Sequence, residues 1–245
     1  MAIKVIPLLK DNYGYLIDTP SGAICVDPSE AKPILNTHAN LIAILNTHHH
    51  IDHIEGNEEL INRFHCPLFA PSDERIPGIT TIVAPGETIT IEDKTFKVIS
   101  TPGHTRTHIA YYEPKLGALF CGDTLFAAGC GRILEGTPEQ LLASLQTICQ
   151  LPPETLIFCG HEYTVRNLEF ALAIEPANAK LQKRFAHARA LREQNMPTVP
   201  TTLKEELETN PFLRCDQVAL KQALGIPGAT TLEAFTTLRS LKDAF

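Results

Sequence analysis

The sequence lacks any apolar stretch long enough to cross a membrane. Its apolar runs are short and interrupted by polar residues, whereas a spanning helix needs roughly 18 consecutive apolar residues. The segment Met1–Pro7 has no basic region followed by an apolar run and a small-residue cleavage site, so we expect no signal peptide. We therefore expect no membrane partner.

Positive charge is also scarce. The 245 residues include 21 Lys and Arg against 28 Asp and Glu, which gives a formal net charge of −7. An acidic chain is a poor candidate for general binding to nucleic acid or to an anionic membrane. With 44% hydrophobic residues, the chain is long enough to bury a core without disulfides.

Paired cysteines are absent as well. The seven cysteines are scattered, odd in number and contain no CxxC pair. This pattern fits a reducing cytosol, so we expect a cytoplasmic protein in which most cysteines are small buried apolar residues.

The first two-thirds of the chain predicts strands with a few interleaved helices. A hairpin is expected at Tyr15–Asp18 and Ala23–Val26, and helices are expected at about Ile54–Phe64 and Pro138–Cys149. After Tyr163, apolar residues recur at helical spacing, with a break expected at Glu175-Pro176. We predict sheet layers covered by helices, followed by an all-helical region from about residue 164.

The strongest motif is the segment Thr47-His-His-His-Ile-Asp-His53, which directly follows a predicted strand. Imidazole and carboxylate groups suit Zn, Fe or Mn. His48 and His50 lie two residues apart in an extended loop, so both can reach one ion. Asp52 and His53 lie further along, which suggests a second ion.

Three other predicted strands end on a residue that can bind a metal. Gly precedes each of these residues, which permits a tight turn and close approach of the backbone. The residues are His104, Asp123 and His161. Loops fixed by rigid strands commonly carry active sites, so we expect these residues to complete a two-metal centre.

These motifs, in this order, resemble the metallo-β-lactamase superfamily, which implies a four-layered αββα sandwich. Within it, Cys121–Phe126, Gly129–Arg132, Cys159–Thr164 and the tail from Asn210–Arg214 to Leu238–Asp243 resemble the glyoxalase II (hydroxyacylglutathione hydrolase) family. The resemblance implies a catalytic domain at 1–163 and a small helical glutathione-binding domain at 164–245.

The resemblance also implies how the metal ligands are shared. His48, His50 and His104 would bind one ion, Asp52, His53 and His161 the other, and Asp123 would bridge both. Asp52 and Asp123 would thereby support catalysis with a hydroxide held by the two ions, most plausibly Zn, with Fe or Mn as alternatives. His49 and His108 are not ligands in the family pattern, and His108 is expected to orient its neighbours.

Family members bind glutathione through positions that correspond here to Arg132, Leu134, Tyr163, Arg239 and Lys242. Leu134 departs from the family, in which tyrosine is frequent, and the pair Arg106-Thr107 replaces a more usual apolar-glycine pair. Arg239 and Lys242 lie three residues apart and share one helix face, so both could meet a carboxylate. Two cations near a helix C-terminus could equally serve the helix dipole alone.

The resemblance implies hydrolysis of S-D-lactoylglutathione and other S-2-hydroxyacylglutathiones to glutathione and the acid, D-lactate in the first case. This is the second step of methylglyoxal detoxification. The alternatives are a β-lactamase, an RNA-processing nuclease, a persulfide dioxygenase and a non-catalytic metal-binding protein. The helical tail argues against a β-lactamase, and the acidic balance argues against a nuclease. The second set of ligands argues against a persulfide dioxygenase, and the cation pair argues against a non-catalytic metal-binding protein. No heptad or large apolar repeat suggests a partner face, so we expect a monomer.

Overall fold

The structure, a computed structural model, describes residues 3–245 and divides into two compact units. The first two residues of Met1–Pro7, where we expect no signal peptide, lie outside this range. The first unit comprises residues 3–100, 107–122 and 158–162, and the second comprises residues 101–106, 123–157 and 163–245. Along residues 3–245, no helix is both long and apolar enough to cross a membrane.

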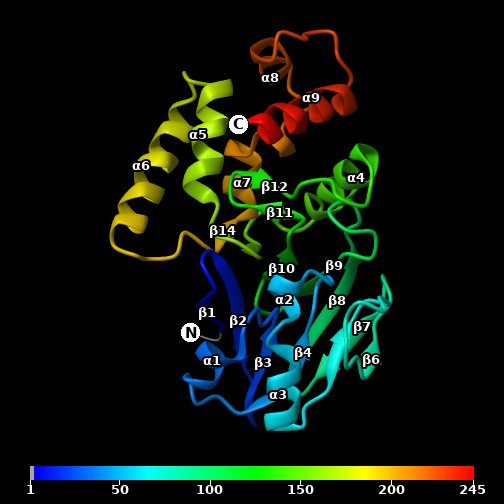
Figure 1. The fold of residues 1–245 in the computed structure, drawn as a ribbon. Coiled ribbons are helices and arrows are strands. Elements are labelled where there is room, and N and C mark those ends of the chain that lie inside the picture. The colour runs from blue at the N-terminus through cyan, green and yellow to red at the C-terminus, as the bar shows by residue number, and fades with distance from the viewer. Residues whose placement is uncertain (1–2) are drawn as a thin grey trace. The chain divides into compact units, whose positions relative to one another are not determined.

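The first unit contains the strands that the alternating apolar runs predicted (Figure 1). Its elements are β1 (Ile3–Leu8), β2 (Asn12–Asp18), β3 (Ala23–Val26), α1 (Ala31–Leu35), β4 (Leu41–Leu45), α2 (Ile51–Ile54), α3 (Asn57–Phe64), β5 (Leu68–Ala70), β6 (Thr81–Ile82), β7 (Thr88–Ile91), β8 (Lys94–Ser100), β9 (Ile109–Glu113) and β10 (Ala118–Gly122).

These strands form two sheets. One has the order β1-β2-β3-β4-β5-β6, antiparallel through β3 and parallel from there on. The other runs β10-β9-β8-β7 and continues beside β10 with Phe158 and Cys159. The sheets pack through Tyr15, whose ring centroid lies 5.6 Å from that of Phe120 and 5.1 Å from that of Phe158. The expected hairpin at Tyr15–Asp18 and Ala23–Val26 is confirmed.

Helices α1, α2 and α3 cover the outer face of the first sheet (Figure 1). Ile34, Ile54 and Leu60, one from each helix, join Leu16 and Ile44 in a single buried apolar cluster. The expected helix at Ile54–Phe64 is in fact two helices, because the chain turns at Gly56. There the Gly56 N–H donates to the Pro28 carbonyl at 2.9 Å, and a side chain would meet that carbonyl oxygen at 2.6 Å.

The second unit is mainly helical. Its elements are β11 (Leu125–Phe126), β12 (Gly129–Cys130), α4 (Pro138–Ile148), α5 (Thr164–Ile174), α6 (Ala179–Glu193), β14 (Thr201–Thr202), α7 (Leu203–Thr209), the 3-10 helix η1 (Pro211–Leu213), α8 (Val218–Ala223) and α9 (Thr231–Ala244). β13 (Leu156–Cys159) begins in this unit, where Leu156 and Ile157 pair with β14.

The helix ends in the second unit follow the capping signals of the sequence. Thr137 begins α4 with a full capping box to Gln140, and Thr230 does the same for α9. At Thr202 only half of a capping box forms, because the Glu205 carboxylate accepts a hydrogen bond from Thr201 instead. The break at Glu175-Pro176 separates α5 from α6 as predicted.

Candidate metal centre

His48 and His50 meet in the loop that follows β4. The Nε2 atom of His48 lies 3.1 Å from the Nδ1 atom of His50. An ion with four tetrahedral bonds of about 2.1 Å holds its ligand atoms about 3.4 Å apart, so the two nitrogens are spaced to share one ion. The His48 ring also stacks on buried His108 at 4.7 Å between centroids, which places His108 beside a predicted ligand.

Asp52, His53 and His161 form a second donor group in the first unit. Asp52 and His53 lie on the short helix α2, and His161 follows β13. One donor atom from each residue lies within 4.8 Å of the others. The Oδ2 atom of Asp52 is 3.8 Å from Nε2 of His53 and 3.4 Å from Nε2 of His161. Two imidazoles and a carboxylate at this spacing fit a divalent metal ion.

Acidic and amide side chains form hydrogen bonds with the members of this donor group. Asp27 contacts Nδ1 of His53 at 3.2 Å, and Asp11 contacts Nδ1 of His161 at 3.2 Å. Asn12 donates from Nδ2 to Oδ2 of Asp52 at 3.0 Å. Carboxylates that bind the outer nitrogen of a metal-binding histidine fix its tautomer and orient the ring. Both histidines therefore present Nε2 to the proposed ion.

Asp27 lies within reach of His48 and His53 and could be mistaken for a third ligand. Its carboxylate already accepts hydrogen bonds from the Thr47 backbone N–H at 2.8 Å and the Thr47 hydroxyl at 2.7 Å. Since His53 meets Asp27 through Nδ1 and Asp52 through Nε2, we interpret Asp27 as an orienting residue.

His104 and Asp123 lie together in the second unit. Nε2 of His104 is 3.4 Å from Oδ2 of Asp123, a spacing that again suits two ligands of one ion. Nδ1 of His104 lies 2.9 Å from the carbonyl oxygen of Arg132. A carbonyl oxygen can only accept, so Nδ1 carries the proton and neutral His104 presents the lone pair of Nε2 to a metal.

His49 and Thr107 meet at one buried carboxylate, Asp73. His49 Nδ1 is 3.5 Å from Oδ2 of Asp73, and the Thr107 hydroxyl donates to the same oxygen at 2.7 Å. Hydrogen bonds from Arg75 are the main cause that holds the pKa of Asp73 far below its usual range. Thr107, one of the two residues that depart from the family pattern, thus shares this carboxylate with His49.

Three of the residues expected to bind substrate are exposed in the second unit. Leu134 is 58% exposed and the Arg132 side chain is 69% exposed. Tyr163 is 36% exposed, and its ring lies 5.3 Å from that of Phe126. Nε of Arg132 lies 3.8 Å from Oδ1 of Asp243.

Arg239 and Lys242 differ, although both lie on α9. Arg239 is 5% exposed and donates to the carbonyl of Cys130 at 2.9 Å and to Asp243 at 3.0 Å. Lys242 is half-buried, and its Nζ atom donates to the carbonyl of Arg166 at 3.2 Å. Burial, followed by repulsion from Arg166 and Arg239, lowers the pKa of Lys242 to about 8.

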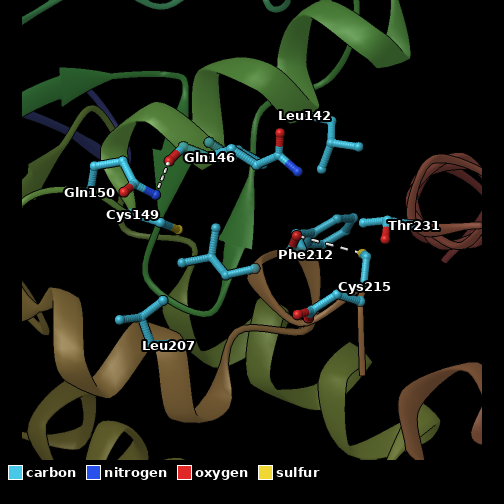
Figure 2. A pocket seen from close by; sticks show the side chains of 11 residues that line it. Leu142, Gln146, Cys149, Gln150, Leu207, Phe212, Cys215 and Thr231 are labelled. Atoms are coloured by element: carbon cyan, nitrogen blue, oxygen red, sulfur yellow. Dashed lines mark hydrogen bonds between the residues drawn. The ribbon is translucent and has the colours of Figure 1, made fainter. Parts of the chain in front are cut away.

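A cavity of about 280 Å³ lies in the second unit, among α4, α7 and η1 (Figure 2). Apolar side chains such as Leu207 and Phe212 line it together with the thiols of Cys149 and Cys215. Burial raises the pKa of Cys149 to about 11 and that of Cys215 to about 12, so both thiols stay protonated near neutral pH. None of the predicted metal or substrate residues is among the described residues that line this cavity.

Sequence reasoning missed three residues that orient the ligands, namely Asp11, Asn12 and Asp27. Asp27 carried a usable signal, because it follows strand β3 just as the predicted ligands follow their own strands. Asp11 and Asn12 carried none, since their partners His161 and Asp52 lie 150 and 40 positions away in the chain.

Comparison with known proteins covers both parts of the chain. The family model of the metallo-β-lactamase superfamily matches residues 14–161, and the model described as hydroxyacylglutathione hydrolase C-terminus matches residues 162–245. The chain is 48% identical to a hydroxyacylglutathione hydrolase of Synechococcus sp. strain JA-3-3Ab over 254 residues, with 100% of both chains covered.

Two solved structures are also similar. One is the BLEG-1 B3 metallo-β-lactamase, with 26% identity, a TM-score of 0.65, and 86% of this chain and 99% of the other covered. The other is TTHA1623 in a di-iron-bound form, with 26% identity, a TM-score of 0.61, and coverage of 85% and 98%. The expected fold class, a metallo-β-lactamase sandwich followed by a C-terminal helical region, is confirmed.

Proposed function

The chain belongs to the hydroxyacylglutathione hydrolases of the metallo-β-lactamase superfamily, and we propose that it hydrolyses S-D-lactoylglutathione to D-lactate and glutathione. The observation that carries this proposal is the full-length match to a hydroxyacylglutathione hydrolase, which includes the C-terminal helical segment. Other S-2-hydroxyacylglutathiones share the same thioester and belong to the same substrate class. The reaction is the second step of methylglyoxal detoxification.

The donor groups support a centre for two divalent metal ions. We assign His48, His50 and His104 to one ion, Asp52, His53 and His161 to the other, and Asp123 to both. Bound there, the ions would supply Lewis acidity and lower the pKa of a shared water toward neutrality. Nitrogen and oxygen donors favour zinc, with iron or manganese as alternatives that the donor set also accepts.

Neighbouring groups fix the orientation of the histidine donors. Asp27, Asp11 and the Arg132 carbonyl each engage the Nδ1 atom of a histidine, so Nε2 remains available at His53, His161 and His104. Histidine rings fixed in this way need little rearrangement to bind metal. The leaving group is a thiolate, which departs readily, so we assign no strong general acid to the site.

For the substrate, we propose contacts with Arg132, Leu134, Tyr163, Arg239 and Lys242. Glutathione is an acidic tripeptide, and Arg132 offers the most exposed cation of this set. The apolar side chain of Leu134 cannot form a hydrogen bond with the substrate, which would weaken binding by about 0.5–1.5 kcal/mol relative to a tyrosine.

The remaining assignments follow from the family and from the sequence. We propose a catalytic domain at residues 1–163 and a glutathione-binding domain at residues 164–245. We also propose a cytoplasmic monomer, because the seven cysteines are scattered without a CxxC pair and the sequence has no heptad or large apolar repeat.

Replacing Asp123 with alanine tests the metal centre. We expect Asp123→Ala to lose thioesterase activity and to reduce the metal content of freshly purified protein, measured by elemental analysis. Asp93→Ala is the matched control, because Asp93 is exposed and pairs with its sequence neighbour Lys94. Survival of both activity and metal content in Asp123→Ala would contradict the dinuclear assignment, and preferential hydrolysis of a β-lactam or an RNA would contradict the substrate.

A further inference from the structure

The C-terminal helix α9 reaches the loop that follows β12 through one buried side chain. Arg239 is 5% exposed, and its Nη1 atom donates to the carbonyl oxygens of Cys130 at 2.9 Å and Gly131 at 3.4 Å. Its Nη2 atom donates to Oδ1 of Asp243, one helical turn along, at 3.0 Å. The guanidinium also lies over the Phe212 ring, 5.1 Å from its centroid. Arg239 is therefore fixed on several sides and fixes the loop in return.

This same loop orients His104. The carbonyl oxygen of Arg132 lies 2.9 Å from Nδ1 of His104, directly after the two carbonyls that Arg239 binds. The backbone packs so closely here that a Cβ atom on Gly131 would lie 2.0 Å from the Asp123 carbonyl oxygen and 3.3 Å from the His104 Cβ. A shift of the loop would therefore disturb both His104 and Asp123.

We propose that Arg239 is a positioning residue for the metal ligand His104 and acts through the Cys130–Arg132 loop. This inference rests on the proposed role of His104 and Asp123 as ligands. Arg239 holds the Cys130 and Gly131 carbonyls, the loop places the Arg132 carbonyl, and that carbonyl keeps the proton of His104 on Nδ1. Nε2 of His104 then points at Asp123, 3.4 Å away.

This positioning role is additional to the substrate contact that we propose for Arg239 above. Its Nη1 and Nη2 atoms already donate to protein acceptors inside the unit. Lys242 lies one turn along the same helix, is half-buried and donates to the Arg166 carbonyl, which is remote in sequence from the His104 loop. Two cations of α9 thus have different neighbours, and Lys242 is the matched control.

The test measures metal affinity directly. Metal-free protein is titrated with Zn²⁺ against a competing chelator, and the two binding steps are resolved. We expect Arg239→Gln to weaken one step by about 10–100-fold, the usual effect of losing a group that orients a metal ligand, and to leave the other step unchanged. Asp243→Asn keeps an amide oxygen that can accept from Nη2 but removes the charge that strengthens this hydrogen bond, so we expect a smaller loss in the same step.

Controls separate the possible failures. Lys242→Gln should keep both affinities, and His104→Ala should weaken the same step as Arg239→Gln. Wild-type Zn²⁺ affinity in both Arg239→Gln and Arg239→Lys, with KM raised for lactoylglutathione, would overturn the inference and leave Arg239 with the substrate contact alone. Unchanged affinity in His104→Ala would instead overturn the ligand assignment. Circular dichroism of the metal-free variants identifies any that fail to fold, in which case Asp243→Asn decides the question.

Discussion

Asp27 is the residue whose replacement tests most sharply how the metal-binding histidines are oriented. It is 2% exposed and accepts hydrogen bonds from the Thr47 N–H and hydroxyl while facing Nδ1 of His53 at 3.2 Å. Its backbone has a φ of 46°, a left-handed conformation that asparagine tolerates well. Asp27→Asn therefore changes the hydrogen bonding with little change in volume or backbone strain.

The amide introduced by Asp27→Asn has an NH₂ donor in place of one carboxylate oxygen, and the partners of each oxygen determine which position the NH₂ group takes. The Thr47 N–H can only donate, so the amide oxygen must face it and the amide nitrogen must face the Thr47 hydroxyl and His53. His53 then has to accept at Nδ1, which moves its proton to Nε2, the atom that faces Asp52. We expect metal affinity at this site to fall about 10–100-fold. Loss of the charged hydrogen bond should lower the free energy of unfolding of the metal-free protein by about 1.5–3 kcal/mol.

Urea unfolding of metal-free protein and chelator competition measure the two effects separately. Asp18→Asn is the control, because Asp18 is exposed and its pairing with Lys4 at 3.8 Å contributes little. If Asp27→Asn binds two metal ions as tightly as the wild type, His53 does not depend on Asp27 for its tautomer and the orienting role is refuted.

Three further changes have definite expected outcomes. The pKa of Lys242 is lowered from 10.5 to about 8 in the folded chain, so the unfolded chain binds more protons between these two pH values. The free energy of unfolding, measured with urea, should therefore rise from pH 8 to pH 10 in the wild type. It should change less over this range in Lys242→Met. Leu134→Tyr should lower KM for lactoylglutathione about 2–10-fold at unchanged kcat, and an unchanged KM would count against a substrate contact there. Glu206→Ala should cost about 3–5 kcal/mol in urea unfolding because it removes the fully buried carboxylate that pairs with Arg184, whereas Glu208→Ala, which breaks an exposed pair, should cost less than about 1 kcal/mol.

The local parts of the fold could be predicted from the sequence because their signals are local. Short apolar runs that end in turn residues predicted the hairpin at Tyr15–Asp18 and Ala23–Val26, and the helix expected from about Pro138 is confirmed as α4. The histidine motif predicted the meeting of His48 with His50, since two residues of spacing suffice for it. The Gly56 break was missed because its cause, the Pro28 carbonyl, lies on another segment.

The burial of the Arg239 side chain could not be predicted from the sequence. The spacing of Arg239 and Lys242 places both on one helix face, which suggests equal access to a substrate carboxylate. The structure distinguishes them, because Arg239 finds its acceptors 108 and 109 positions away in the chain. Helical periodicity reports the face of a helix but carries no information on what that face meets.

The distribution of positive charge in the second unit narrows how an acidic substrate can be recognised. The chain has a net charge of −7, so attraction must come from local cations. Asp243 lies 3.0 Å from Nη2 of Arg239 and offsets much of its charge, and burial lowers the pKa of Lys242 to about 8. Of these three cations Arg132 is the most exposed, with 69% of its side chain accessible to solvent, and it lies further from Asp243, at 3.8 Å. Recognition of glutathione should depend on Arg132 most, on Lys242 below pH 8, and less on Arg239, whose charge Asp243 offsets more closely.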